Sequence, residues 1–189
     1  MKALKIIAAI AAAAALLAGC TANSAAEVIM DQSSNSQVVT LKGLSGFSAT
    51  ALDGSSFGDG QLASHDLTVM VFWSPLCGPC LDELTQLQTL AAGLPSSVQV
   101  VTVCLDGRGY EEDVTELLSK AGYTGVTLMK GDDTFMQFSS QIQYTPTTIM
   151  LDGTGAVVGP VMIGASDSMK EDCKTAIDTA LKDMGRPGL

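Results

Sequence analysis

The sequence has little positive charge. Its 189 residues include 10 lysines and arginines against 20 acidic residues, which gives a formal net charge of −10. No basic cluster occurs anywhere along the chain. Nucleic acids and anionic lipid surfaces repel such an acidic protein electrostatically. We therefore exclude nucleic-acid binding from the candidate functions.

Histidine and paired cysteines are equally scarce. His65 is the only histidine, and the five cysteines include a single C-x-x-C pair, Cys77 and Cys80. A structural zinc site built on one such pair needs two further ligands from a second pair, which this chain lacks. A haem attachment site would place histidine directly after the second cysteine, where this sequence has Leu81. We accordingly expect no metal site and no bound cofactor.

Much of the excess of apolar residues lies in the first twenty residues. Two lysines precede an apolar run over residues 6–16, a pattern typical of a secretory signal peptide. The run ends in Leu-Ala-Gly-Cys, which resembles the bacterial lipobox and predicts a lipid-modified Cys20. An uncleaved anchor, or an ordinary signal peptide with an incidental cysteine, are the alternatives. We expect a signal peptide over 1–19, a lipidated Cys20 with a flexible tether to residue 37, and a folded domain over 38–189.

Extended and helical patterns alternate along that domain. The continuous apolar run Val69–Trp73 is typical of a strand buried on both faces. A helix over 79–92 follows, with leucines recurring every third residue and a stop at Gly93. Further strands are expected at 47–52, 98–105, 126–129, 147–151 and 156–163, and further helices at 111–121, 134–140 and 167–184. The last helix should bury Met169, Cys173, Ala176, Ile177, Ala180 and Leu181. The alternation predicts a single α/β domain.

The C-x-x-C pair lies where the buried strand gives way to the helix, in the segment F-W-S-P-L-C-G-P-C. Unpaired N–H groups and the dipole at a helix N-terminus stabilise a thiolate. We expect Cys77 to be the exposed nucleophile, and Cys80, one turn further, to resolve mixed disulfides formed on Cys77. Pro79 suits the first turn, where its missing N–H costs nothing. A purely structural disulfide is the alternative.

Three segments resemble thioredoxin-like proteins of the TlpA/ResA branch, the membrane-tethered reductases of the bacterial cell envelope. They are F-W-x-x-x-C-x-P-C, the preceding F-x-x-x-x-x-D-G-x-x-F hairpin, and the later Y-T-P-T-T-I-M-L-D-G-T-G, and the resemblance extends over residues 44–184. It implies a thioredoxin-like α/β fold with a central mixed sheet flanked by helices and an extra N-terminal β-hairpin. It also implies an extracytoplasmic location.

The resemblance further implies roles for four residues. Pro146 would form a cis peptide bond facing the cysteines, and Thr145 would offer backbone groups to an extended substrate segment. Glu83 would exchange a proton with Cys80, the alternative being an exposed carboxylate at a helix start. Trp73 would be the aromatic residue beside the substrate, the alternative being a packed strand residue.

The sequence departs from the family at several positions. Leu76 stands where the family usually has tryptophan, and Thr85 where this branch often has proline. Val71 and Thr102 occupy the positions of a buried Asp and Lys in cytosolic thioredoxins, so that proton route is absent and Glu83 is favoured instead. The departures leave the redox potential and the partner surface open.

The interpretation that follows is a thiol–disulfide oxidoreductase that reduces protein disulfides without a bound cofactor. Its partners would be protein thiols and disulfides, a membrane electron donor or acceptor, and the membrane that holds its lipid anchor. Alternatives are an oxidant that introduces disulfides, and a copper-binding thioredoxin-like module that uses two cysteines and a distant histidine. A thiol peroxidase ranks last, because its P-x-x-x-T-x-x-C pattern is missing around Cys77. Whether Cys104 and Cys173 form a second disulfide stays open.

Overall fold

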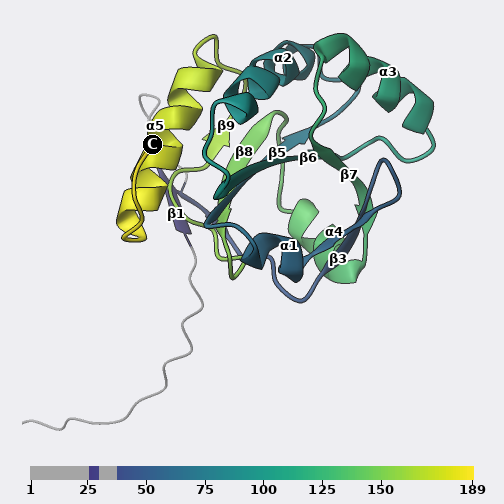
Figure 1. Cartoon of the computed structure of the whole chain (residues 1–189). Helices are drawn as coiled ribbons and strands as arrows, with labels where there is room; N and C mark the ends of the chain where they lie inside the picture. Colours follow the sequence, from purple (N-terminus) through teal and green to yellow (C-terminus); the bar gives the residue numbers. More distant parts are fainter. Residues whose placement is uncertain (1–25, 30–37) are drawn as a thin grey trace, which may run out of the picture.

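The fold is an α/β arrangement around one mixed sheet (Figure 1). A computed structural model of the chain describes residues 26–29 and 38–189. The predicted signal peptide and Cys20 lie outside the described residues. Within these residues no helix combines the length and the apolar character that crossing a membrane requires.

The sheet has seven strands in the order β4-β3-β7-β6-β5-β8-β9. Their bounds are β3 (Ser48–Ala51), β4 (Ser56–Gly58), β5 (Leu67–Trp73), β6 (Val98–Cys104), β7 (Val126–Gly131), β8 (Thr147–Asp152) and β9 (Met162–Ile163). The helices of the described part are α1 (Asp59–Ala63), α2 (Gly78–Ala92), α3 (Glu111–Ala121), α4 (Asp133–Ser139) and α5 (Met169–Asp183). β5 pairs in parallel with β6 and antiparallel with β8, which makes the sheet mixed, as predicted.

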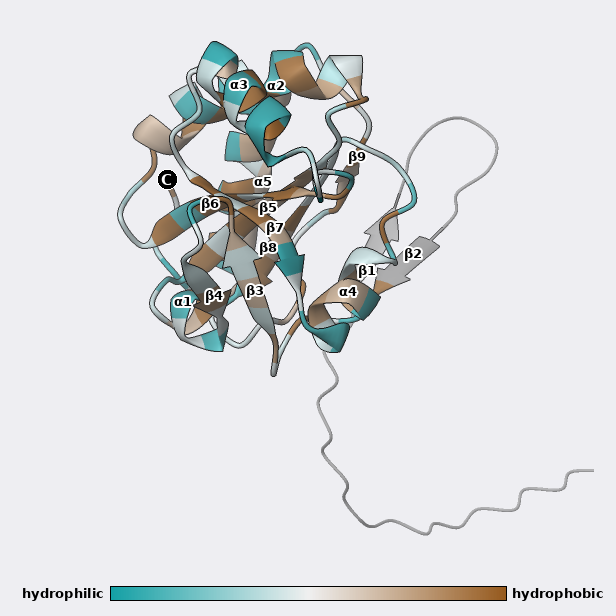
Figure 2. Cartoon of the chain, turned by 90° about the vertical axis from the view of Figure 1, so that its right-hand side faces the viewer, coloured by the Kyte–Doolittle hydropathy of each residue, from teal (hydrophilic) through white to brown (hydrophobic). Residues whose placement is uncertain are grey.

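The central strand β5 is buried along its whole length, as its continuous apolar run predicts. Because side chains alternate along a strand, β5 serves two cores. Val69, Val71 and Trp73 belong to the core covered by α2, α3 and α5. Met70 and Phe72 belong to the core against α1 and α4. Figure 2 shows hydrophobic residues concentrated on the central strands, between these two layers of helices.

Most predicted elements form within a few residues of their expected bounds. The hairpin of β3 and β4 turns through Gly54, whose φ of 84° favours glycine. Helix α3 has its predicted bounds and ends at Gly122 with a φ of 68°. Helix α5 buries all six of the residues predicted for its inner face. These agreements confirm the fold predicted from the sequence.

Three elements differ from expectation. The five-residue helix α1 is not predicted, because it buries only Leu62 and is too short to show a periodicity. The strand expected at 156–163 shrinks to the two residues of β9 and a single bridge at Val157. Gly159 with positive φ and Pro160 without an N–H interrupt it. Residues 26–29, where a tether was predicted, form strand β1 (Ala26–Ile29), which pairs with β2 (Val38–Leu41). The prediction missed this strand because a composition averaged over the tether does not detect so short a strand.

Candidate redox site

Cys77 lies at the junction between β5 and α2. After the strand ends at Trp73, the N–H of Cys77 donates to the carbonyl of Ser74 at 3.0 Å, which reverses the chain in a tight turn. Cys77 is the N-cap of α2, with extended φ and ψ angles of −95° and 96°, and Pro79 lies in the first turn. The chain therefore places one cysteine immediately before the helix and the second within its first turn.

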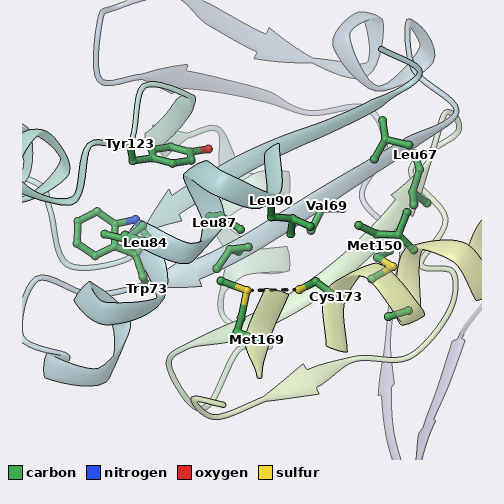
Figure 3. Packing of buried hydrophobic residues seen from close by; sticks show 14 of the residues in the cluster. Leu67, Val69, Trp73, Leu84, Leu87, Leu90, Tyr123, Met150, Met169 and Cys173 are labelled. Carbon is green, nitrogen blue, oxygen red and sulfur yellow. Dashed lines mark hydrogen bonds between the residues drawn. The ribbon is translucent and has the colours of Figure 1, made fainter. Parts of the chain in front are cut away.

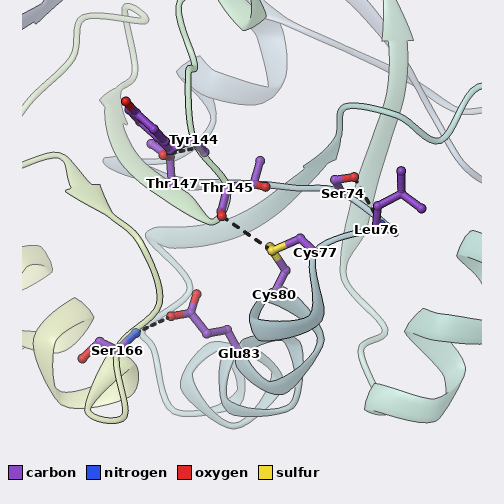
Figure 4. Close-up of a disulfide and its surroundings, with 9 residues drawn as sticks. All are labelled: Ser74, Leu76, Cys77, Cys80, Glu83, Tyr144, Thr145, Thr147 and Ser166. Carbon is purple, nitrogen blue, oxygen red and sulfur yellow. Dashed lines mark hydrogen bonds between the residues drawn. A yellow bond between two sulfur atoms is a disulfide. The ribbon is translucent and has the colours of Figure 1, made fainter.

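Cys77 and Cys80 form a disulfide with a Cα–Cα separation of 5.3 Å (Figure 4). Cys77 is half-buried, whereas Cys80 is only 1% exposed. No side chain caps α2 and no acidic residue lies in its first turn. The free N–H groups and the positive end of the helix dipole therefore act on the sulfur of Cys77 without competition from a capping group.

The loop before β8 faces this sulfur. The Thr145–Pro146 peptide bond is cis, as the family resemblance implies. The Sγ of Cys77 lies 3.6 Å from the carbonyl oxygen of Thr145. In the disulfide form this sulfur carries no hydrogen, so the approach is a contact; the reduced thiol would be able to donate to the same oxygen. Thr147 Oγ1 donates to the carbonyl of Tyr144 at 2.7 Å and closes the loop.

Glu83 is buried on the same helix as the cysteines, with 6% of its surface exposed. It lies three residues after Cys80, so the two side chains share one face of α2 (Figure 4). Its Oε1 accepts a hydrogen bond of 2.9 Å from the backbone N–H of Ser166. Burial raises the pKa of Glu83, and the Ser166 bond offsets part of that rise. The alternative of an exposed carboxylate at a helix start is therefore wrong.

Trp73 has no exposed surface. It packs beneath α2 beside Leu84 (Figure 3), because its position on β5 directs it into the same core as Val69. Its Nε1 is buried without a hydrogen-bond partner among the described residues. A side chain this deeply buried cannot contact a substrate. The structure corrects the substrate-binding role expected for Trp73 and supports the alternative of a packed strand residue.

Cys104 and Cys173 are both free and buried, so they form no second disulfide. The Sγ of Cys173 instead lies 3.7 Å from the Sδ of Met169 (Figure 3). It also lies 3.9 Å from the Sδ of Met162. Burial raises the pKa of each thiol to about 12. Because the thiolate is the reactive form, neither cysteine can take part in exchange at neutral pH while it stays buried.

The single histidine lies far from the disulfide. His65 lies two residues before the start of β5, whose seven residues span about 20 Å, and Cys77 follows the other end of that strand. The described residues contain no group of three or more His, Cys, Asp or Glu side chains that could hold a metal ion. A copper site that joins both cysteines to His65 is therefore not supported.

Sequence reasoning overlooked a hollow beside the disulfide. The hollow has a volume of about 400 Å³ and is lined by Pro75, Leu76, Asp106, Tyr110, Asp113 and Leu117. The sequence marked Leu76 as a departure from the family but did not show that the loop before α3 would lie next to it. The parallel pairing of Trp73 with Cys104 brings that loop to the same end of the sheet.

Comparisons with known proteins agree with this geometry. No established sequence family matches the chain. A thioredoxin-like protein of Haemophilus influenzae is 33% identical over 100 residues, which span 53% of this chain and 57% of that protein. The chain thus covers little more than half the length of this relative.

Many solved structures share the fold, including the following two. One is MTB DsbF, with a TM-score of 0.52 and 26% identity over 67% of this chain and 88% of that one. The other is a secreted Mycobacterium tuberculosis disulfide oxidoreductase homologous to E. coli DsbE, with a TM-score of 0.53 and 21% identity over 67% and 90%. The chain therefore has the thioredoxin-like fold of thiol–disulfide oxidoreductases. Its place in the TlpA/ResA branch stays a prediction.

Replacing Glu83 with glutamine should change how stability depends on pH. Because burial raises the pKa of Glu83, the folded protein binds this proton more tightly than the unfolded chain does. The resulting stability is fully present below the pKa of the unfolded chain, about 4.3, and is lost as pH rises through the folded pKa. The free energy of unfolding of the wild type minus that of Glu83→Gln should therefore fall as pH increases.

Urea denaturation of the disulfide form in steps between about pH 4 and pH 8 measures this difference. Glutamine retains an oxygen that can accept the Ser166 hydrogen bond, so the substitution mainly removes the ionisation. Asp82→Asn controls for the loss of one negative charge from an exposed neighbouring position on α2. A difference between wild type and Glu83→Gln that does not change with pH would show that Glu83 is not perturbed.

Proposed function

We propose that the chain is an extracytoplasmic thiol–disulfide oxidoreductase that reduces disulfides in protein substrates. The observation that carries the proposal is the unequal placement of the two cysteines. Cys77 is half-buried at the start of α2 and faces the loop at Pro146, whereas Cys80 is enclosed. A structural disulfide requires neither an accessible sulfur nor a free helix N-terminus behind it.

The proposed reaction consists of two exchanges. The thiolate of reduced Cys77 attacks one sulfur of a client disulfide, whose S–S bond breaks as the Cys77–client bond forms. The departing client sulfur leaves as a thiolate and takes up a proton. Cys80 then attacks the sulfur of Cys77, which restores the Cys77–Cys80 disulfide and releases the second client thiol. Two electrons pass to the client, and an electron donor at the membrane must return the protein to its dithiol form.

The loop before β8 would hold the client during this exchange. The carbonyl of Thr145 lies 3.6 Å from the Sγ of Cys77, so a client sulfur bonded to Cys77 must come close to this backbone. An extended client segment can pair with such a backbone as an added strand does. Pro146 would set the direction of the loop. Because the contact is made through the backbone, binding by Thr145 and Pro146 requires no particular side chain, and many different client sequences could be bound.

Glu83 would accept the proton of Cys80 before the second exchange. It shares a helix face with Cys80, is buried, and has a raised pKa, so its carboxylate is a stronger base than an exposed one. The turn of α2 that shelters Cys80 from solvent also leaves few other acceptors for this proton. The carboxylate would then act on the thiol that solvent does not reach.

The location rests on the N-terminal sequence. The apolar segment and the Leu-Ala-Gly-Cys ending support export and lipid attachment at Cys20. One structural relative, the Mycobacterium tuberculosis oxidoreductase, is a secreted protein. The protein would therefore act at the outer side of a bacterial cytoplasmic membrane or within the cell envelope, held there by its lipid anchor.

Substitution of each cysteine tests the mechanism. Cys77→Ala should abolish reduction of a protein disulfide, because the attacking sulfur is lost. Cys80→Ala should instead accumulate a stable mixed disulfide with the client, because nothing resolves it. Non-reducing gel electrophoresis and mass spectrometry detect the adduct. Cys104→Ala is the matched control and should retain activity, and full activity in Cys77→Ala would refute the mechanism.

Replacing Glu83 should slow the second exchange alone. We expect Glu83→Gln to slow client release from the Cys77 adduct by about 100-fold at neutral pH, while formation of the adduct changes little. The deficit should shrink at alkaline pH, where a larger share of Cys80 is ionised without proton transfer to Glu83. Stopped-flow fluorescence separates the two phases, and Asp82→Asn on the same helix serves as the control. An equal deficit at every pH would point to a purely structural role.

The direction of electron flow is tested by the reduction potential of the Cys77–Cys80 pair. A reductant should have a value near that of thioredoxin, about −270 mV, and an oxidant a value near that of DsbA, about −120 mV. We expect the former. Trp73 packs in the same core as Cys80, so its fluorescence in a series of thiol/disulfide buffers should report the redox state. A value near −120 mV would make the protein an oxidant.

A further inference from the structure

Large apolar side chains are exposed around the disulfide. Leu76, directly before Cys77, is 90% exposed, Tyr144 is 65% exposed and Tyr110 is 60% exposed. These three are the most exposed large hydrophobic side chains in the described part of the chain. Figure 4 shows Leu76 and Tyr144 on different sides of Cys77. Leu76 and Tyr110 line the same hollow, and exposed apolar groups gathered in this way commonly mark a binding surface.

The hollow on the Leu76 side is shaped to take a side chain. Its volume of about 400 Å³ lies in the range of small ligand sites. Pro75 and Leu76 form the wall nearest the disulfide, and Tyr110 and Leu117 form the apolar wall on α3. Because Leu76 precedes Cys77 directly, a residue in this hollow would lie close in sequence to the cysteine under attack.

The rim of this hollow is acidic. Asp106 and Asp113 line it, and no lysine or arginine does. Both aspartates are exposed, and within residues 41–189 neither carboxylate forms an ion pair or a hydrogen bond. Two carboxylates that line the same hollow, with no lysine or arginine in its lining, attract positive charge from a partner. The whole chain is also strongly acidic, so a second copy would be repelled where a basic partner is attracted.

We propose that this hollow selects client disulfides whose cysteine is flanked by an apolar residue and then by lysine or arginine. The apolar side chain fills the space between Leu76 and Leu117, and the cation lies over Asp106 and Asp113. The Thr145 backbone holds the client on the other side of the sulfur. The inference rests on the proposed exchange reaction at Cys77 and specifies which substrates that reaction prefers.

Short peptide disulfides test this preference directly. The probes are disulfide-linked dimers of acetylated, amidated pentapeptides Z-Leu-Cys-Leu-Z, in which Z is lysine or glutamate, and a version with serine in place of leucine. Placing the same residues on both sides of the cysteine removes any dependence on the direction of binding. The second-order rate constant for oxidation of the reduced protein is followed by Trp73 fluorescence at low and high salt.

The decisive quantity is the ratio of the lysine-peptide rate to the glutamate-peptide rate. We expect Asp106→Asn/Asp113→Asn to lower this ratio about tenfold relative to the wild type. Asp133→Asn/Asp183→Asn makes the same change in net charge at exposed positions on α4 and α5, and should keep the wild-type ratio. Comparing variants in this way cancels the effect of lysine on the reactivity of the peptide disulfide itself. High salt should reduce the wild-type ratio.

The apolar part of the preference has its own variant. Leu76→Ser should lower the ratio of the leucine-peptide rate to the serine-peptide rate about tenfold, because the wall of the hollow is lost. Leu76 is almost fully exposed, so its replacement should not affect folding. Light scattering of the wild type and Leu76→Ser tests whether a second copy of the chain occupies the hollow instead. A wild-type dimer that Leu76→Ser dissociates would overturn the inference in favour of self-association.

Two results distinguish failure of this inference from failure of the proposed function. If every peptide oxidises the reduced wild type but both of its rate ratios match those of the variants, the hollow does not select clients and the inference is wrong. If the reduced wild type fails to react even with 2-hydroxyethyl disulfide, the exchange reaction itself is refuted and the inference falls with it.

Discussion

The pairing of β5 with its two neighbours is the constraint on which the site depends. Phe72 pairs with Thr147 on β8, so the residues just before Thr147, including the cis Pro146, must lie beside the end of β5. Trp73 pairs with Cys104 on β6, so the loop that follows Cys104 lies at the same end. A shift of either register by one residue would also turn the apolar side chains out of their cores. Hydrophobic burial of the strand therefore fixes the positions of the reactive groups.

The same arrangement explains why two cysteines three residues apart differ chemically. The first precedes the helix and meets solvent, free N–H groups and the carbonyl of Thr145. The second lies one turn further on, where α2 packs against the sheet, and shares its surroundings with Glu83. Local helix geometry supplies the electrostatic difference, and packing supplies the difference in access. Neither requires a metal ion or a charged side chain in contact with the first sulfur.

Much of the fold could be predicted from the sequence because the signals are local. The apolar run of β5, the helix stop at Gly122 and the buried stripe of α5 each follow from residues close together in the chain. The predictions that failed depend on how separate elements pack against one another. The C-x-x-C motif could not show that Trp73 is covered completely, since α2 and the residues around Leu84 supply that cover. Nor could it reveal the hollow beside Leu76, which exists only because a loop from another strand end lies next to it.

The burial of Cys104 and Cys173 has a consequence for the behaviour of the protein in an oxidising compartment. Covalent polymers form when thiols on different molecules meet, and these two thiols are enclosed in the folded protein. A cross-link through either of them therefore records that the molecule had opened, at least locally, before the sulfur reacted. The two cysteines therefore report on the folded state: they do not cross-link intact molecules, and a disulfide that includes either of them persists until it is reduced.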